Sequence, residues 1–138
     1  MTAPSTNTVI IGGGIMGAGI AFEALAAGFP VTIVETLEAY CEPARGRVEH
    51  YEARARSRGA DLDGYGVLTV TTDMSTALSG ADVVVEAVPE DLAIKQSVFE
   101  RIGAEVNDNA VLASNTSGLP IGVLGACLLY TSPSPRDS

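Results

Sequence analysis

Short apolar runs alternate with longer segments of helical periodicity along this chain. Apolar runs that predict strands lie at 8–11, 31–34, 68–72, 83–87 and 111–114. Segments that predict helices lie at 16–27, 75–78 and 93–106, and a long crossover fills 37–66. Strands that alternate with helices in this way specify a parallel sheet covered by helices on both faces. We therefore predict an α/β fold.

Two helical stripes locate the expected core. In 93–106, Ile94, Val98, Ile102 and Val106 recur every four residues, which is typical of a helix laid on a sheet. The crossover carries a second stripe, with Pro43 at the start of its helix. That stripe comprises Leu37, Tyr40, Ala44, Val48, Tyr51 and Ala55. We expect both stripes to face the sheet.

The crossover also holds most of the basic side chains. Five of the eight Lys and Arg residues lie there: Arg45, Arg47, Arg54, Arg56 and Arg58. At about 100° per residue, they fall on two nearly opposite stripes and do not converge on one point. This favours a solvated helix over an anion site. His50, on the same segment, is expected to be a solvated helix residue.

The first apolar run leads into a glycine-rich turn and a helix of small residues. Gly12, Gly14 and Gly17 match the spacing G-x-G-x-x-G, with Ile15 and Met16 between the last two. The first glycine permits a tight turn, the second lets the backbone approach a pyrophosphate, and the third lets helix pack against strand. The free N–H groups of the helix N-terminus then bind phosphate oxygens. This context indicates a dinucleotide site in a Rossmann-type, doubly wound parallel sheet.

An acidic residue ends the second apolar run. Glu35 follows Gly17 by 18 residues, close to the distance at which a carboxylate accepts hydrogen bonds from the adenosine ribose. A phosphate on that ribose, about 4 Å away, would be disfavoured by about 1 to 4 kcal/mol. We therefore predict NAD as the cofactor, in preference to NADP.

Three further stretches carry a family resemblance: Thr-Thr-Asp at 71–73, the run at 85–96, and Ala-Ser-Asn-Thr-Ser-Gly-Leu-Pro-Ile at 113–121. With the glycine-rich turn, they closely resemble the NAD-binding domain of the L-3-hydroxyacyl-CoA dehydrogenases over residues 7–126. The resemblance implies oxidation of the 3-hydroxyl of an acyl-CoA in fatty-acid oxidation, with hydride passing to NAD. In that family a histidine takes the hydroxyl proton, and a glutamate orients the histidine.

The resemblance also assigns site residues. Glu90 and Lys95 match positions that line the cleft for cofactor and acyl-CoA, and Ser117 matches the serine between the nicotinamide and the substrate hydroxyl. A helix N-cap is the alternative role for Ser117. The expected cofactor contacts are Gly12, Gly14, Ile15, Met16, Gly17, Glu35, Glu90, Lys95 and Ser117, and Ser117 is the expected catalytic residue.

The chain departs from the family pattern in three ways. The crossover 37–66, which contacts CoA in the family, is shorter than in many members, and Gly118 replaces a frequent second serine. No histidine follows His50, whereas the family's catalytic histidine comes after Ile121 in a His-x-Phe-Asn-Pro segment. Two alternatives therefore stay open: a sister dehydrogenase of the carnitine or gulonate type, and a non-catalytic NAD-binding module.

The last twelve residues follow a different pattern. Residues 127–138 resemble the translation of a sequencing-library adapter, although their Ser-Pro repeats are also typical of a disordered tail. We expect 1–126 to be a partial Rossmann domain without its sixth strand, catalytic histidine and C-terminal helical domain. Such a fragment should be inactive and poorly soluble, and the full-length protein should form a homodimer.

Composition narrows the remaining classes. The net charge of −9 gives no basic surplus for nucleic acid. No apolar stretch is long enough to span a membrane, and the first eight residues carry no signal sequence. Cys41 and Cys127 suggest neither a disulfide framework nor a metal site. We expect a cytoplasmic protein that binds a small-molecule acyl-CoA substrate.

Overall fold

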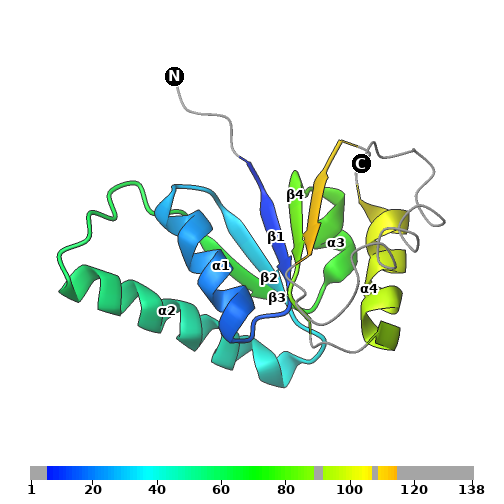
Figure 1. Ribbon diagram of the computed structural model, residues 1–138, viewed down its shortest axis with the longest axis horizontal. Helices are drawn as coiled ribbons and strands as arrows, with labels where there is room; N and C mark the ends of the chain where they lie inside the picture. Colours follow the sequence, from blue (N-terminus) through cyan, green and yellow to red (C-terminus); the bar gives the residue numbers. More distant parts are fainter. Residues whose placement is uncertain (1–5, 89–91, 107–108, 115–138) are drawn as a thin grey trace.

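A parallel sheet forms the centre of the molecule (Figure 1). The computed structural model describes residues 6–88, 92–106 and 109–114 of the 138. Five strands pair in the order β3-β2-β1-β4-β5. They are β1 (Thr8–Ile11), β2 (Val31–Val34), β3 (Leu68–Thr71), β4 (Val83–Glu86) and β5 (Val111–Ser114). Every pairing is parallel, which confirms the expected sheet.

Helices cover both faces of this sheet. They are α1 (Ile15–Ala26), α2 (Cys41–Ser57), α3 (Met74–Ser79) and α4 (Leu92–Glu105), with a 3-10 helix, η1 (Glu38–Tyr40), before α2. In Figure 1, α1 and α2 lie on one side of the strands and α3 and α4 on the other. Alternation in β1 divides the core accordingly: Ile10 packs with α1 and α2 residues, whereas Val9 and Ile11 pack with α3 and α4 residues.

The carboxyl ends of the central strands are in register. Ile11 pairs with Val34 on one side and Glu86 on the other, and Val34 pairs with Thr71. The chain runs outward through β2 and β3 and returns to β4 on the other side of β1, so the strand order reverses between β1 and β4. In open parallel sheets, ligands bind beside the carboxyl ends of the strands at such a reversal.

The element boundaries agree with the sequence prediction to within one residue, apart from the start of α2. This helix begins at Cys41, two residues before Pro43. Proline is tolerated in a first turn because the N–H groups there lack partners within the helix. The prediction that the crossover stripe faces the sheet is also wrong for its first two residues, since Leu37 is 55% and Tyr40 50% exposed. The intervening 3-10 turn, with about three residues per turn, shifts these two side chains out of phase with α2.

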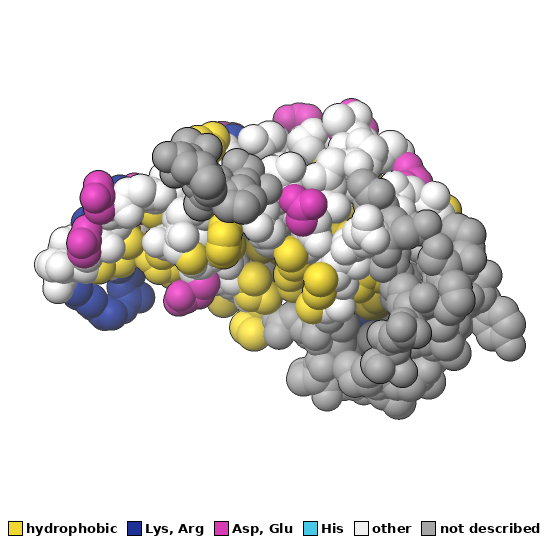
Figure 2. Space-filling view, turned by 90° about the horizontal axis from the view of Figure 1, so that it is seen from above, with side chains coloured by type: hydrophobic (Ala, Val, Ile, Leu, Met, Phe, Trp, Pro, Cys, Tyr) yellow, Lys and Arg dark blue, Asp and Glu magenta, His cyan; other side chains and the backbone are white. Residues whose placement is uncertain are grey.

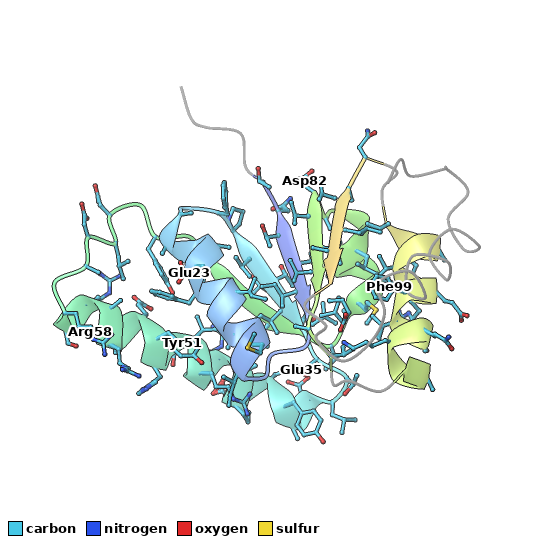
Figure 3. The ribbon with its side chains drawn as sticks, viewed as in Figure 1. Glu23, Glu35, Tyr51, Arg58, Asp82 and Phe99 are labelled. Atoms are coloured by element: carbon cyan, nitrogen blue, oxygen red, sulfur yellow. The ribbon has the colours of Figure 1, made fainter. Side chains whose placement is uncertain are left out.

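The α4 stripe is confirmed where the structure describes its side chains. Val98 and Ile102 are buried, and Val106 packs against the same cluster. Phe99 of α4, labelled in Figure 3, is also buried, which the four-residue stripe did not predict. Glu90, Ser117 and the segment 127–138 lie outside the described residues. Within the described part of the chain, no helix is long and apolar enough to cross a membrane.

Candidate functional site

The glycine-rich turn joins the end of β1 to α1 at the carboxyl edge of the sheet. Gly12 has φ +103°, a left-handed conformation that glycine adopts readily. A Cβ at Gly12 would lie 2.8 Å from the carbonyl oxygen of Ala87, and one at Gly17 would lie 1.9 Å from the carbonyl oxygen of Gly12. Both positions therefore require glycine, because α1 packs directly on the turn and the turn packs on the end of β4.

Gly14 differs from its neighbours because it faces open space. A Cβ there would meet nothing within 4 Å. Gly14 is the N-cap of α1, and no side chain caps this end of the helix. The first helical residues, Ile15 and Met16, are 72% and 62% exposed. The structure thus combines accessible backbone N–H groups, the positive end of a helix dipole and room for a pyrophosphate.

Glu35 lies directly against this turn. It follows β2, and its backbone N–H donates to the carbonyl oxygen of Thr71 at 2.9 Å. Its carboxylate oxygen Oε2 accepts a hydrogen bond of 2.8 Å from the N–H of Gly13. Figure 3 shows Glu35 at the lower end of the sheet, beside the start of α1. The half-buried carboxylate is therefore held next to the turn, where the hydroxyls of the adenosine ribose of a bound dinucleotide would lie.

Three residues at the turn were missed by the sequence analysis: Gly13, Arg47 and Tyr51. A Cβ at Gly13 would lie 2.5 Å from the Cβ of Ala44. Arg47 Nη1 donates to the carbonyl oxygen of Gly13 at 2.8 Å, and the Tyr51 hydroxyl donates to the carbonyl oxygen of Ile15 at 3.3 Å. The spacing 44, 47, 51 on one helical face was available, but nothing in the sequence says which loop that face contacts.

A buried ion pair lies at the carboxyl end of β4. Glu86 and Lys95 are both fully buried, and the Lys95 ammonium donates to Glu86 Oε2 and, at 2.9 Å, to the carbonyl oxygen of Val88. Glu86 Oε2 also accepts from the N–H of Val88 at 2.7 Å. Both side chains therefore hold the backbone of Val88, just after β4. Lys95 thus lies at the expected edge of the sheet, with its ammonium bound to protein groups.

A groove of about 540 Å³ runs between α1 and α2. Its lining is mainly apolar and includes Met16, Phe22 and Tyr51, and its charged residues are Arg54, Arg58 and the acidic Glu23. Figure 2 shows basic side chains gathered at the end of the molecule where α2 ends. The groove thus combines an apolar wall with two cationic side chains and one carboxylate. The arginine cluster is therefore more than a solvated face: Arg47 contacts the turn, and Arg54 and Arg58 line the groove.

The other titratable candidates that the structure describes are His50 and Cys41. His50 is exposed on α2. Burial and the neighbouring carboxylates Glu38 and Glu35 raise the pKa of the Cys41 thiol above its usual value. Within 6–88, 92–106 and 109–114, no group of three or more His, Cys, Asp or Glu side chains is arranged to hold a metal ion.

Comparison with known proteins identifies relatives of this chain. Residues 7–130 match the family model for the 3-hydroxyacyl-CoA dehydrogenase, NAD binding domain. A 3-hydroxybutyryl-CoA dehydrogenase of Mycobacterium tuberculosis is 42% identical over 118 residues, covering 81% of this chain and 41% of the relative. A 5-formyl-3-hydroxy-2-methylpyridine 4-carboxylate 5-dehydrogenase of Mesorhizobium japonicum is 38% identical over 126 residues, covering 90% of this chain and 41% of the relative.

Solved structures agree with these relatives. The crystal structure of M. tuberculosis FadB2 superimposes with a TM-score of 0.81 and 38% identity, over 91% of this chain and 46% of that chain. The chain therefore spans less than half the length of the relatives it matches, and it corresponds to their cofactor-binding part.

Proposed function

We propose a function for this chain, which belongs to the family of 3-hydroxyacyl-CoA dehydrogenase NAD-binding domains. It forms the cofactor-binding part of an enzyme that oxidises the 3-hydroxyl of an acyl-CoA. The cofactor is NAD. Relatives named 3-hydroxybutyryl-CoA dehydrogenase support this substrate class. The oxidation of fatty acids, or a related acyl-CoA pathway, is the metabolic setting that we propose.

One observation carries the proposal: the Glu35 carboxylate binds the N–H of Gly13, directly beside the open space at Gly14. A dinucleotide needs a carboxylate for ribose hydroxyls and free backbone N–H groups for pyrophosphate, and here one short turn presents both. Bound NAD supplies the hydride acceptor. The chain's own contribution at this turn is to fix the adenosine diphosphate half of the cofactor by Gly12, Gly14, Ile15, Met16 and Gly17.

For the substrate, we propose that the α1–α2 groove receives the CoA moiety. Arg54 and Arg58 offer cations for its phosphates, and the apolar lining suits its pantetheine chain. Glu90, Lys95 and Ser117 keep the roles that the family resemblance gives them, as proposals. We assign the base that takes the hydroxyl proton to none of these 138 residues, because His50, the one histidine, is exposed on α2. The chain by itself should bind NAD without turnover.

A second candidate is a dehydrogenase whose substrate carries no CoA. The relative from M. japonicum, named for a pyridine carboxylate, favours it, since its identity with this chain is close to that of the 3-hydroxybutyryl-CoA dehydrogenase. Binding of free CoA distinguishes the two candidates. We expect CoA to protect the α1–α2 groove in hydrogen exchange, and no protection at saturating CoA would favour the second candidate.

Cofactor choice tests the role of Glu35. NADH and NADPH are titrated into the wild-type chain and the variant Glu35→Arg, and binding is followed by nicotinamide fluorescence. We expect the wild type to prefer NADH. The variant should shift the ratio of the two affinities toward NADPH by about tenfold or more, because a side chain that repels the ribose phosphate of NADPH is replaced by one that attracts it. Glu100→Arg, on the far face of the sheet, is the matched control. An unchanged ratio in Glu35→Arg contradicts the assignment.

A further inference from the structure

Two consecutive peptide groups of the glycine-rich turn are each bound by a charged side chain. The N–H of Gly13, in the peptide between residues 12 and 13, donates to Glu35 Oε2 at 2.8 Å. The carbonyl oxygen of Gly13, in the next peptide, accepts from Arg47 Nη1 at 2.8 Å. Glu35 comes from the end of β2 and Arg47 from the second turn of α2. An acidic and a basic side chain from different elements therefore both bind the backbone of Gly13.

Peptide geometry makes the second contact relevant to the cofactor. In a trans peptide, the carbonyl and the following N–H lie in one plane and point in opposite directions. Arg47 therefore fixes the direction of the Gly14 N–H by binding the Gly13 carbonyl. That N–H belongs to the residue that borders open space. A cationic donor on the carbonyl also polarises the peptide, which strengthens its N–H as a donor.

Packing around Gly13 leaves this turn little freedom. A Cβ at Gly13 would lie 2.5 Å from Ala44 Cβ, 2.8 Å from Glu35 Oε2 and 3.0 Å from Ile33 Cγ2. Ala44, Arg47 and Tyr51 succeed one another on one face of α2, and the Tyr51 hydroxyl donates to the carbonyl oxygen of Ile15. Helix α2 therefore packs against the turn and restricts its movement through these three side chains.

We propose that Arg47 is a positioning residue of the dinucleotide site, which aims the Gly14 N–H at the pyrophosphate while Glu35 holds the preceding peptide and recognises the ribose. This inference rests on the proposed function. The proposal gives Arg47 and Glu35 different roles at the turn. Arg47 acts on the pyrophosphate subsite through the backbone, and Glu35 acts on both subsites.

Ligands that contain or lack a pyrophosphate test this division. Kd for NADH is measured by fluorescence, and ADP and adenosine are used as competitors, with wild type, Arg47→Met, Arg47→Lys and Glu35→Gln. Arg47→Met should weaken NADH and ADP by about tenfold, the equivalent of one charge-assisted hydrogen bond, and leave adenosine within twofold. Arg47→Lys should recover most of the loss, because one ammonium can also donate to the carbonyl. Glu35→Gln should weaken all three ligands.

The matched control is Arg45→Met, which makes the same charge change on the same helix. Arg45 pairs with Glu42 at 3.8 Å, and we expect its removal to leave every ligand within twofold. Urea unfolding without ligand checks that Arg47→Met is folded. Unchanged NADH affinity in Arg47→Met overturns the inference and leaves the proposed function standing, and so does an equal loss for ADP and adenosine. All variants are made in the full-length protein that contains this domain, and a wild-type full-length protein that fails to bind NADH overturns both.

Discussion

The backbone that follows β1 and the backbone that follows the adjacent strand β4 are held in place by different kinds of side-chain contact. The turn after β1 consists of glycine backbone and is held by side chains that remain partly or fully exposed, Glu35, Arg47 and Tyr51. Just after β4, the backbone of Val88 is bound by Glu86 and Lys95, which are fully buried. The first leaves its N–H groups open to a ligand. At the second, the two charges bind each other and the N–H and carbonyl groups of Val88. Accessible backbone and buried charge thus lie side by side at one edge of the sheet.

The largest expected effect lies in the β4 connection. Glu86→Ala leaves the Lys95 ammonium buried without its carboxylate, and we expect a loss of about 3–5 kcal/mol in the free energy of unfolding. Urea denaturation of the chain measures it. The control, Glu105→Ala, removes a carboxylate paired with Arg101 at the surface and should cost less than about 1 kcal/mol. Similar losses in the two variants would remove the contrast between buried and exposed charge.

Within the turn, two glycine substitutions should separate folding from binding. Gly17→Ala places a Cβ 1.9 Å from the carbonyl oxygen of Gly12, so backbone must move, and we expect about 1–3 kcal/mol of destabilisation together with loss of NADH binding. Gly14→Ala meets no atom within 4 Å. It should lower the free energy of unfolding by less than about 1 kcal/mol and still weaken NADH, since the methyl group enters the pyrophosphate space. Equal destabilisation by both substitutions would contradict the open space at Gly14.

The smallest effect concerns two surface carboxylates near α3, Asp73 and the partly buried Glu105. Hydrogen bonds from the Thr76 side chain and backbone lower the pKa of Asp73 below 3.8, and hydrogen bonding to Ser75 and then Arg101 lowers the pKa of Glu105 below 4.5. Because the folded-state pKa is the lower one, each carboxylate stabilises the fold above its ordinary pKa. That contribution is lost as pH falls through the folded value.

The measurement is the urea midpoint at a series of pH values from neutrality to below 3.8. Stability should decline through the ordinary carboxyl range, and Asp73→Asn should flatten part of the decline because the titrating N-cap of α3 is removed. A variant with the wild-type pH profile would show that Asp73 contributes nothing to it.

The sequence predicted the geometry of the glycine-rich turn well and did not predict the ion pair at the end of β4, for a physical reason. Glycine spacing, a preceding strand and a following acid are local features, so the positions of Gly12, Gly14, Gly17 and Glu35 followed from the chain alone. The pairing of Glu86 with Lys95 spans nine residues and depends on how α4 returns to the sheet, and the contact of Arg47 with Gly13 spans 34. The family resemblance assigned Lys95 to the cofactor cleft without indicating its buried partner.

What the sequence by itself determined is the alternation of strands and helices, the glycines that a tight turn requires, and the family, because these depend on neighbours along the chain. What only the tertiary structure decided is that α2 braces the turn through Ala44, Arg47 and Tyr51, and that Glu86 neutralises Lys95 inside the protein. Such contacts depend on which helix face meets which loop once the sheet has formed. Helical periodicity fixes the face of a helix but not its partner.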